Sequence, residues 1–152
     1  MLIVKNRKAL FNHELLEKYL AGIELRGFEV KAIKENNVSF EGSYVDLEDG
    51  QAYVKNMHIG KYSKQSQEYN EKEADRPRRL LLHGEELLKL KREMDEKGKT
   101  AIPLALLLKA GRIKLEFAVV KGRKKHESKQ LLKKRQIEID LQKDAKQRGI
   151  II

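Results

Sequence analysis

The sequence predicts a mainly β fold, a closed or partly closed antiparallel barrel of roughly six short strands with two helices packed against it. Three observations predict this class. Apolar residues alternate in several short segments, Asp49-Gly50 is a strong hairpin signal between two of them, and two segments of the body have helical spacing. The 152 residues suffice for one domain with an appendage.

The first helix is expected after Asn12, a residue type that favours helix N-caps. Apolar side chains follow at helical spacing, and Ala21-Gly22 supplies a stop; they are Leu15, Leu16, Tyr19 and Leu20. From Ile23 the apolar positions alternate instead, and Gly27 interrupts them before the alternation resumes through Ala32. This pattern predicts a strand with a β-bulge or a bend.

A strand meander is expected next. Residues 38–47 and 52–57 alternate in character, and Asp49-Gly50 joins them as a tight turn. Residues 59–75 are polar and without periodicity, which predicts a long loop of the kind that is mobile or functional. Residues 80–82 then form a short apolar run that predicts a buried strand.

The second helix is predicted over residues 84–96, with Leu87, Leu88 and Met94 facing inward and Gly98 ending it. Two apolar strands follow, over residues 100–108 and 113–120, joined at Ala110-Gly111. Pro103 lies in the first of these strands. Because proline lacks the backbone N–H, we expect an edge position or a bulge there.

Charge divides the chain into two regions. The formal net charge is +10, and residues 121–152 hold eleven basic and four acidic residues, or +7 of that total. We therefore predict a body over residues 1–120 and a basic tail over 121–152. Such an excess favours a polyanionic partner, which is nucleic acid or an anionic membrane face.

The sequence also excludes several classes. It contains no cysteine, so disulfides, thiolate metal sites and a cysteine nucleophile are excluded together. No apolar run is long enough to span a bilayer and the first residues lack a signal-peptide layout, so we expect a cytoplasmic protein. The four histidines show neither metal-ligand nor catalytic spacing, which favours a non-enzymatic protein without cofactor or metal.

One segment combines charge with core-forming residues. Arg76, Arg78 and Arg79 run directly into residues 80–82, and arginine forks suit phosphate oxygens. This predicts a rigid basic edge for RNA. The alternative is a solvated loop that leads into a buried strand.

The tail has its own pattern. Ser128 is placed to cap a helix in which Ile137, Leu141 and Ala145 share one narrow face. A face this thin buries little, so we predict a tail that is disordered alone and helical against RNA. The alternative is a charged helix packed loosely on the body.

Several motifs together resemble the SmpB family of bacterial proteins over nearly the whole chain. They occur in the family's order and spacing: Asn6-Arg7-Lys8-Ala9, Ala21-Gly22-Ile23, Gly27-Phe28-Glu29-Val30-Lys31, Ser43-Tyr44, Asn56-Met57-His58-Ile59, the segment 76–83 and Lys121-Gly122-Arg123-Lys124. The sequence departs from the family at His13-Glu14, where the family has Tyr-Phe, and at Glu127-Ser128-Lys129, where it tends to have Asp-Lys-Arg.

The resemblance implies a small antiparallel β-barrel of OB-like type with two to three packed helices and a basic C-terminal tail. It implies an RNA-binding adaptor that binds the tRNA-like domain of tmRNA and delivers it to stalled ribosomes for rescue by trans-translation. The tail would read the empty decoding centre and mRNA channel, in contact with small ribosomal subunit RNA. The protein would be a monomer without a membrane partner.

The resemblance also assigns residues. RNA-binding positions would be Asn6, Arg7, Lys8, Glu29, Lys31, Lys34, Asn56, Arg76, Arg78, Arg79, Lys121 and Lys124. Tail positions at the decoding centre would be Gly122, Lys125, His126, Lys129, Lys133, Lys134 and Arg135. For Glu29 the alternative is that it anchors a nearby arginine or backbone group. Two other functions stay open: a generic OB-fold RNA-binding or ribosome-associated protein without tmRNA specificity, and a membrane-surface protein that uses the tail as its anchor.

Overall fold

The computed structural model describes residues 1–64 and 70–122, and it is mainly β. Its elements, in chain order, are β1 (Leu2–Lys5), β2 (His13–Ile23), α1 (Gly27–Lys34), β3 (Val38–Ser39), β4 (Tyr44–Glu48), β5 (Gln51–Lys55), β6 (His58–Ile59), the 3-10 turn η1 (Glu71–Glu73), β7 (Arg78–Leu81), α2 (Gly84–Met94), β8 (Lys99–Lys109) and β9 (Arg112–Gly122). The predicted tail from residue 123 onward lies outside the described residues.

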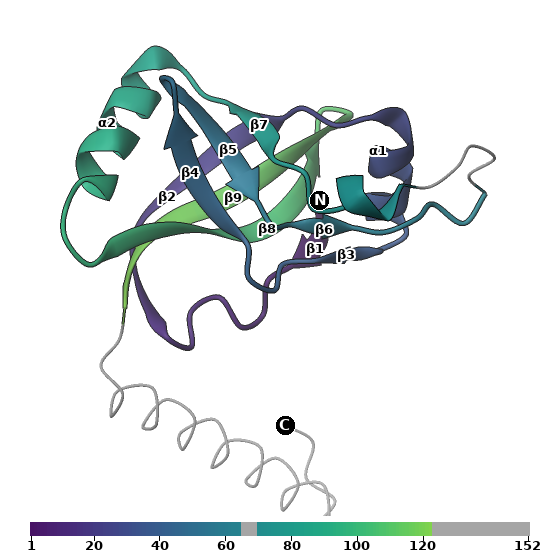
Figure 1. Ribbon diagram of the computed structural model, residues 1–152, viewed down its shortest axis with the longest axis horizontal. Helices are drawn as coiled ribbons and strands as arrows, with labels where there is room; N and C mark the ends of the chain where they lie inside the picture. The colour runs from purple at the N-terminus through teal and green to yellow at the C-terminus, as the bar shows by residue number, and fades with distance from the viewer. Residues whose placement is uncertain (65–69, 123–152) are drawn as a thin grey trace, which may run out of the picture.

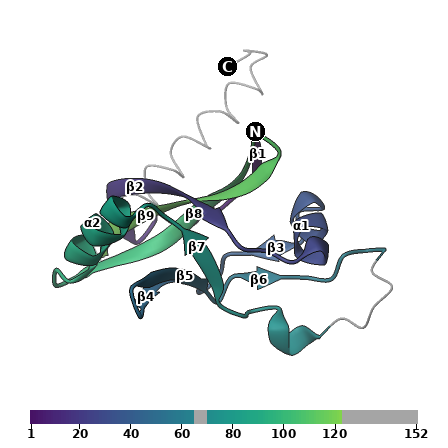
Figure 2. The same cartoon turned by 90° about the horizontal axis from the view of Figure 1, so that it is seen from above.

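Seven of these strands form one antiparallel sheet in the order β1-β8-β4-β5-β7-β2-β9. Because β8 also pairs with β9, the sheet closes into a ring of six strands, and β1 lies outside the ring on β8. Strands β3 and β6 form a separate two-stranded sheet. Figures 1 and 2 show α1 and α2 at opposite ends of the molecule. The prediction of a mainly β antiparallel fold with two helices is confirmed.

The three longest strands, β2, β8 and β9, have 11 residues each and form one wall of the ring. Along β9, alternate residues such as Leu115, Phe117 and Val119 belong to the main core, where the Tyr19 and Phe117 rings stack 5.2 Å apart. The opposite parity faces a second, smaller cluster, made of Ala9, Ile102, Leu104, Ala118 and Val120. Both faces are therefore buried over the middle of β8 and the second half of β9, which explains their nearly continuous apolar sequence there.

The predicted bulge at Pro103 is confirmed. The register between β8 and β9 shifts between Pro103 and Ala105, so the ladder is interrupted where proline has no N–H to donate. The Pro103 carbonyl accepts a hydrogen bond from Asn6 Nδ2 at 2.8 Å, and the Leu104 carbonyl accepts one from the Asn6 backbone N–H at 2.7 Å. Asn6 thereby fastens the N-terminal loop to the bulge.

The helix predicted after Asn12 is wrong, because residues 13–23 form strand β2. The strand pairs with β9 from His13 opposite Gly122 to Gly22 opposite Lys114, and its odd-numbered residues are the more buried ones. Leu15 and Tyr19 are four residues apart, a spacing that fits one face of a helix and also one face of a strand, whereas Leu16 and Leu20 are exposed in β2. Pairing with a distant long strand decides the outcome, since helix propensity is a weak local preference.

The strand predicted through Gly27 is also wrong, because residues 27–34 form helix α1. Its buried residues are Glu29, Ala32 and Ile33, which lie on one helical face at spacings of three and four. The Glu29 carboxylate accepts a hydrogen bond from the Arg26 backbone N–H at 2.8 Å and so caps the first turn. The alternation of apolar residues in the sequence gives no sign that Glu29 is buried and caps the first turn, so it does not predict this helix.

The predicted hairpin at residues 49–50, the second helix and the last two strands form, but two other predictions are wrong in part. Residues 38–47 are not one strand, because β3 pairs with β6 in the separate sheet, and Leu81 in the predicted buried strand is half exposed. Asp49 and Gly50 both have positive φ, 50° and 76°, as a two-residue type I′ hairpin between β4 and β5 requires. Helix α2 forms as expected, but Leu88 is 52% exposed, and Leu90 is the fully buried leucine instead. The predicted long loop starts at the last residue of β6 and contains η1 within its described part. In the described part of the chain, no helix is long and apolar enough to cross a bilayer.

The turn between β8 and β9 gives a stability prediction. Ala110 has φ 52° and precedes Gly111 at φ 76°, and the left-handed region disfavours alanine but tolerates asparagine. We expect Ala110→Asn to raise the free energy of unfolding by roughly 0.5–1 kcal/mol, measured by urea denaturation. Gly111→Ala, which forces a β-carbon into the same region, serves as the opposite control and should destabilise. An unchanged or lower stability of Ala110→Asn would contradict this interpretation.

Candidate nucleic-acid interface

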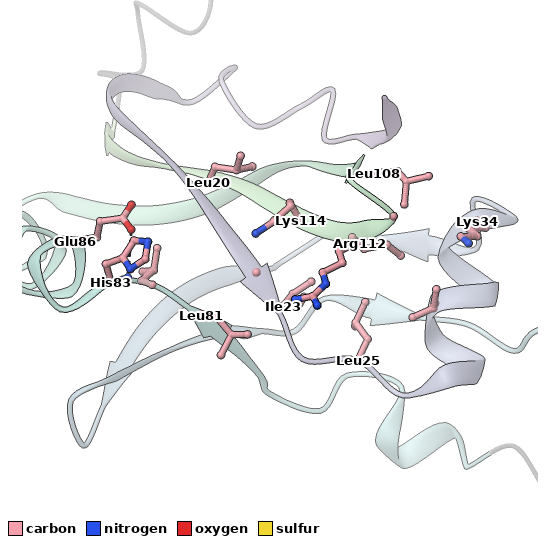
Figure 3. Close-up of a pocket in the computed structure, with 15 residues that line it drawn as sticks. Leu20, Ile23, Leu25, Lys34, Leu81, His83, Glu86, Leu108, Arg112 and Lys114 are labelled. Carbon is pink, nitrogen blue, oxygen red and sulfur yellow. Dashed lines mark hydrogen bonds between the residues drawn. The ribbon is translucent and has the colours of Figure 1, made fainter.

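A surface groove lies where strand β2 ends, between β7, β9 and α1 (Figure 3). Figure 3 shows Lys34 of α1 at one end of it and His83 and Glu86 at the other. The residues that line it are Leu20, Gly22, Ile23, Leu25, Val30, Lys34, Leu81, Leu82, His83, Glu86, Leu108, Gly111, Arg112, Ile113 and Lys114. Three stretches far apart in sequence, 20–34, 81–86 and 108–114, therefore build this surface.

Local structure explains how the groove arises. At Gly22 an added β-carbon would lie 3.3 Å from the β-carbon of Leu81, so the absence of a side chain lets β2 and β7 approach closely. Arg112 and Lys114 flank the buried Ile113 on β9, and alternation turns their side chains to the opposite face of the strand. Lys34 ends α1, where a cation is favoured by the helix dipole.

The groove combines an apolar floor with a cationic rim. Leu81, which is 49% exposed, lines it together with Leu20 and Leu25. Lys34, Arg112 and Lys114 add three positive charges, and Glu86 is the one acidic residue among the lining side chains. Exposed apolar surface suits bases and riboses, and a row of cations suits phosphates. This arrangement can bind a polyanion.

Beside the groove, Glu29 and Arg78 form a buried ion pair between α1 and β7. Glu29 is 2% exposed and Arg78 is 0% exposed. Arg78 Nε donates to Glu29 Oε2 at 2.7 Å, and its Nη atoms donate to the carbonyls of Met57 at 2.7 Å and Ala74 at 2.9 Å. All sides of this guanidinium are satisfied inside the protein, as burial of a charge requires.

Ionisation of Glu29 follows from the same contacts. Burial opposes its negative charge, but the hydrogen bond from the Arg26 N–H and those from Arg76 and Arg78 outweigh burial and lower the pKa of Glu29. The carboxylate is therefore charged at neutral pH. The alternative interpretation of Glu29, that it anchors arginines and a backbone group, is confirmed by these contacts.

The three arginines of segment 76–83 have different environments. Arg78 has no exposed surface, so the expectation of a phosphate contact is corrected: its guanidinium holds the fold. Arg76 also bonds to Glu29 but is 24% exposed, and its Nε is buried without a hydrogen-bond partner in the described part of the chain. Arg79 is 43% exposed and contacts Gln51 at 3.2 Å and Glu24 at 3.6 Å. Arg79 and part of Arg76 are the surfaces that RNA can reach.

The other predicted residues are dispersed. Of the predicted set, Lys34 lines the groove, whereas Arg7 and Lys8 are exposed on a second concavity bordered by residues 38–43. Asn56 is exposed after β5 with φ 59°. Lys121 and Gly122 end strand β9, where Gly122 pairs with His13. The remaining predicted positions lie outside the described residues: Lys124, Lys125, His126, Lys129, Lys133, Lys134 and Arg135.

The sequence interpretation missed Leu81, Arg112 and Lys114 as groove residues. The signal for Arg112 and Lys114 was present, because cations that alternate with Ile113 and Leu115 mark the face of a strand that is not in the core. Arg112 and Lys114 line the same groove as Lys34 only because residues 13–23 form a strand and residues 27–34 form a helix. The sequence pattern predicts the reverse for both elements. Among residues 1–64 and 70–122, no group of three or more His, Asp or Glu residues could hold a metal ion.

The fold and the groove define a class: small proteins with a closed antiparallel sheet that present a cationic, partly apolar groove to a polyanion. Residues 3–147 match the family model described as SmpB protein. An SsrA-binding protein of Nostoc punctiforme is 42% identical over 144 residues, which cover 95% of this chain and 92% of that relative. The SsrA-binding protein of Treponema denticola is 38% identical over 148 residues, covering 97% and 95%.

A solved structure agrees with these relatives. It is described as "tmRNA-SmpB: a journey to the center of the bacterial ribosome", and it matches with a TM-score of 0.68 and 36% identity over 82% of this chain and 87% of that chain. The chain belongs to the SmpB family. The resemblance inferred from the sequence motifs is thereby confirmed.

Proposed function

We propose that this protein is a non-enzymatic RNA-binding adaptor that binds tmRNA and acts with it on stalled ribosomes in trans-translation. The observation that carries the proposal is the apolar groove with its rim of Lys34, Arg112 and Lys114, in a chain of the SmpB family. Relatives over nearly the full length are named SsrA-binding proteins, and SsrA is tmRNA. The closed ring of six strands supports a barrel of OB-like type as the RNA-binding body.

The body and the tail have different roles in this proposal. The groove holds the tRNA-like domain of tmRNA, with its cations on phosphates and its leucines against riboses or bases. Arg79 and the exposed part of Arg76 extend the phosphate contacts along β7, and Arg7 and Lys8 supply further contacts on their own concavity. The tail enters the decoding centre and mRNA channel and contacts RNA of the small ribosomal subunit. The protein acts as a monomer in the bacterial cytoplasm.

Competition binding tests the proposed RNA specificity. The full chain is bound to labelled tmRNA, and unlabelled tmRNA or bulk tRNA is added at a fixed salt concentration. We expect tmRNA to displace the label at far lower concentration than tRNA does. Equal displacement by both would favour the generic OB-fold RNA-binding function instead. Sedimentation with anionic vesicles in parallel tests the membrane alternative, which predicts binding to lipid.

Substitution of the rim tests the groove itself. Arg112→Gln with Lys114→Gln removes two positive charges whose side chains form no ion pair or hydrogen bond within residues 1–64 and 70–122, so the fold should persist. We expect weaker tmRNA binding, with the slope of log affinity against log salt smaller by about two, or one per lost phosphate contact. Lys97→Gln, an exposed lysine in the α2–β8 loop at the other end of the molecule, is the matched control. An unchanged salt slope in the double variant would mean that Arg112 and Lys114 do not contact RNA phosphates and that RNA binds another surface.

A further inference from the structure

A second lysine-rich surface adjoins the groove at the C-terminal end of α1. Lys31 and Lys34 are exposed in the last turn of the helix, and Lys61 and Lys64 are exposed in the segment 61–64 that runs past it. In residues 31–37 and 60–64, four lysines are accompanied by a single carboxylate, that of Glu35. A surface of this composition attracts phosphates, and the carboxylate within it requires an explanation.

Backbone contacts fasten the segment 61–64 beside the helix. The Asn37 Nδ2 donates to the Lys61 carbonyl at 2.9 Å, and the Gly60 N–H donates to the Asn37 carbonyl at 2.9 Å. A β-carbon at Gly60 would collide with the Asn37 side chain, so only glycine permits this approach. The segment therefore begins at a fixed position relative to α1.

Glu35 fixes the middle of the segment. Its carboxylate accepts the Ser63 backbone N–H at 3.0 Å on Oε1 and the Ser63 hydroxyl at 2.6 Å on Oε2. The hydroxyl and backbone hydrogen bonds lower the pKa of Glu35, so it is ionised at neutral pH. One residue earlier, the Lys31 ammonium lies 5.3 Å from the centroid of the Tyr62 ring. Two residues of the segment are thus held by side chains of α1 and its C-cap.

The lysine-rich surface is continuous with the groove, because Lys34 belongs to both. Lys34 lines the groove and precedes Glu35, the residue that holds Ser63. Figure 3 shows Lys34 on α1 at the end of the groove that lies toward this helix. A nucleic-acid strand that leaves the groove at Lys34 would next meet the segment 61–64.

We propose that the segment 61–64 is a phosphate-binding extension of the groove, in which Lys61 and Lys64 contact the RNA backbone and Glu35 is the positioning residue that holds them in place. The inference rests on the proposed RNA-binding function. A segment that is already held in place loses less conformational entropy when it binds, which compensates for the repulsion between one carboxylate and the phosphates.

Glu35→Gln distinguishes a positioning role of Glu35 from a purely electrostatic effect, because the two predict opposite changes in RNA affinity. The substitution removes a negative charge, so electrostatics alone predicts tighter RNA binding. It also replaces one accepting oxygen with an NH₂ group that cannot accept from Ser63, so positioning predicts weaker binding. We expect affinity for the tRNA-like domain of tmRNA to fall roughly three- to tenfold, the loss that one or two hydrogen bonds produce. Ser63→Ala, which changes no charge, should act in the same direction.

The test uses the full chain and compares each variant with wild type in binding affinity, salt slope and thermal unfolding. Lys61→Gln with Lys64→Gln should reduce the salt slope by about two, while Lys97→Gln should not change it. Tighter or unchanged binding by both Glu35→Gln and Ser63→Ala would overturn the inference. So would an unchanged salt slope in the double lysine variant. If wild type itself fails to bind the RNA, the proposed function fails first, which distinguishes the two outcomes.

Discussion

Arg78→Leu is expected to lower the free energy of unfolding by roughly 3–5 kcal/mol, which is typical when one partner of a buried ion pair is removed. The substitution leaves the Glu29 carboxylate buried without its main counter-charge. It also takes the Arg78 donor from the Met57 carbonyl, and it leaves the Ala74 carbonyl with only the Ile59 backbone N–H. Leucine fills most of the lost volume, so the effect isolates the loss of charge and hydrogen bonds. Urea denaturation of the full chain measures it.

Arg79→Leu is the matched control for this prediction. Arg79 is the next residue on β7, but it is largely exposed and its ion pair with Glu24 at 3.6 Å is solvated. Exposed pairs contribute roughly 0–1 kcal/mol, so the control should change stability by less than that. RNA binding should show the reverse order, because Arg79 can reach a phosphate and Arg78 cannot. Equal stability of the two variants would show that Arg78 is not an internal residue.

Truncation after Gly122 is expected to abolish ribosome rescue while tmRNA binding by the body is retained. In the described part of the chain, the residues that line the groove all precede this point, and Gly122 is the last residue of β9. The removed residues hold ten basic and four acidic residues, so overall affinity and salt dependence should decrease while the preference for tmRNA over tRNA persists. Rescue is measured in a reconstituted translation system stalled on an mRNA without a stop codon.

A complementary variant controls the truncation. The full chain with Arg112→Gln and Lys114→Gln retains the tail but is weakened at the groove, so it should regain rescue activity when the tmRNA concentration is raised. The truncated chain should stay inactive at any tmRNA concentration, because its defect is not in RNA affinity. Rescue by the truncated chain would contradict the proposed role of the tail.

Local signals predicted the parts of the fold that depend on neighbouring residues. Asp49-Gly50 and Ala110-Gly111 fix two hairpins because positive φ at both turn positions is a local requirement. The bulge at Pro103 could be predicted because the missing backbone N–H of proline is also a local property. Strand β2 could not be predicted this way, since its leucines also fit a helix and only β9, about a hundred residues later, selects the strand.

The candidate site was predicted less completely than the fold. The sequence pointed to RNA and to Arg76 and Arg79, because cations beside leucines are visible locally, and the family resemblance added Lys34. It could not show that Arg78 is internal, since that depends on a carboxylate 49 residues earlier in the chain. The groove could not be predicted either, because Lys34 and Arg112 line one surface only as a result of how α1 and the end of β2 pack. Residues joined by tertiary contacts alone are the ones that sequence patterns miss.

Rescue of stalled ribosomes by the full chain tests the central claim most directly. The protein is added with tmRNA to a reconstituted translation system in which ribosomes have stalled on an mRNA without a stop codon, and release of the stalled peptide is followed. We predict release that requires both the protein and tmRNA. Binding of tmRNA without any release of the peptide would contradict the proposed adaptor function and leave a protein that binds RNA only.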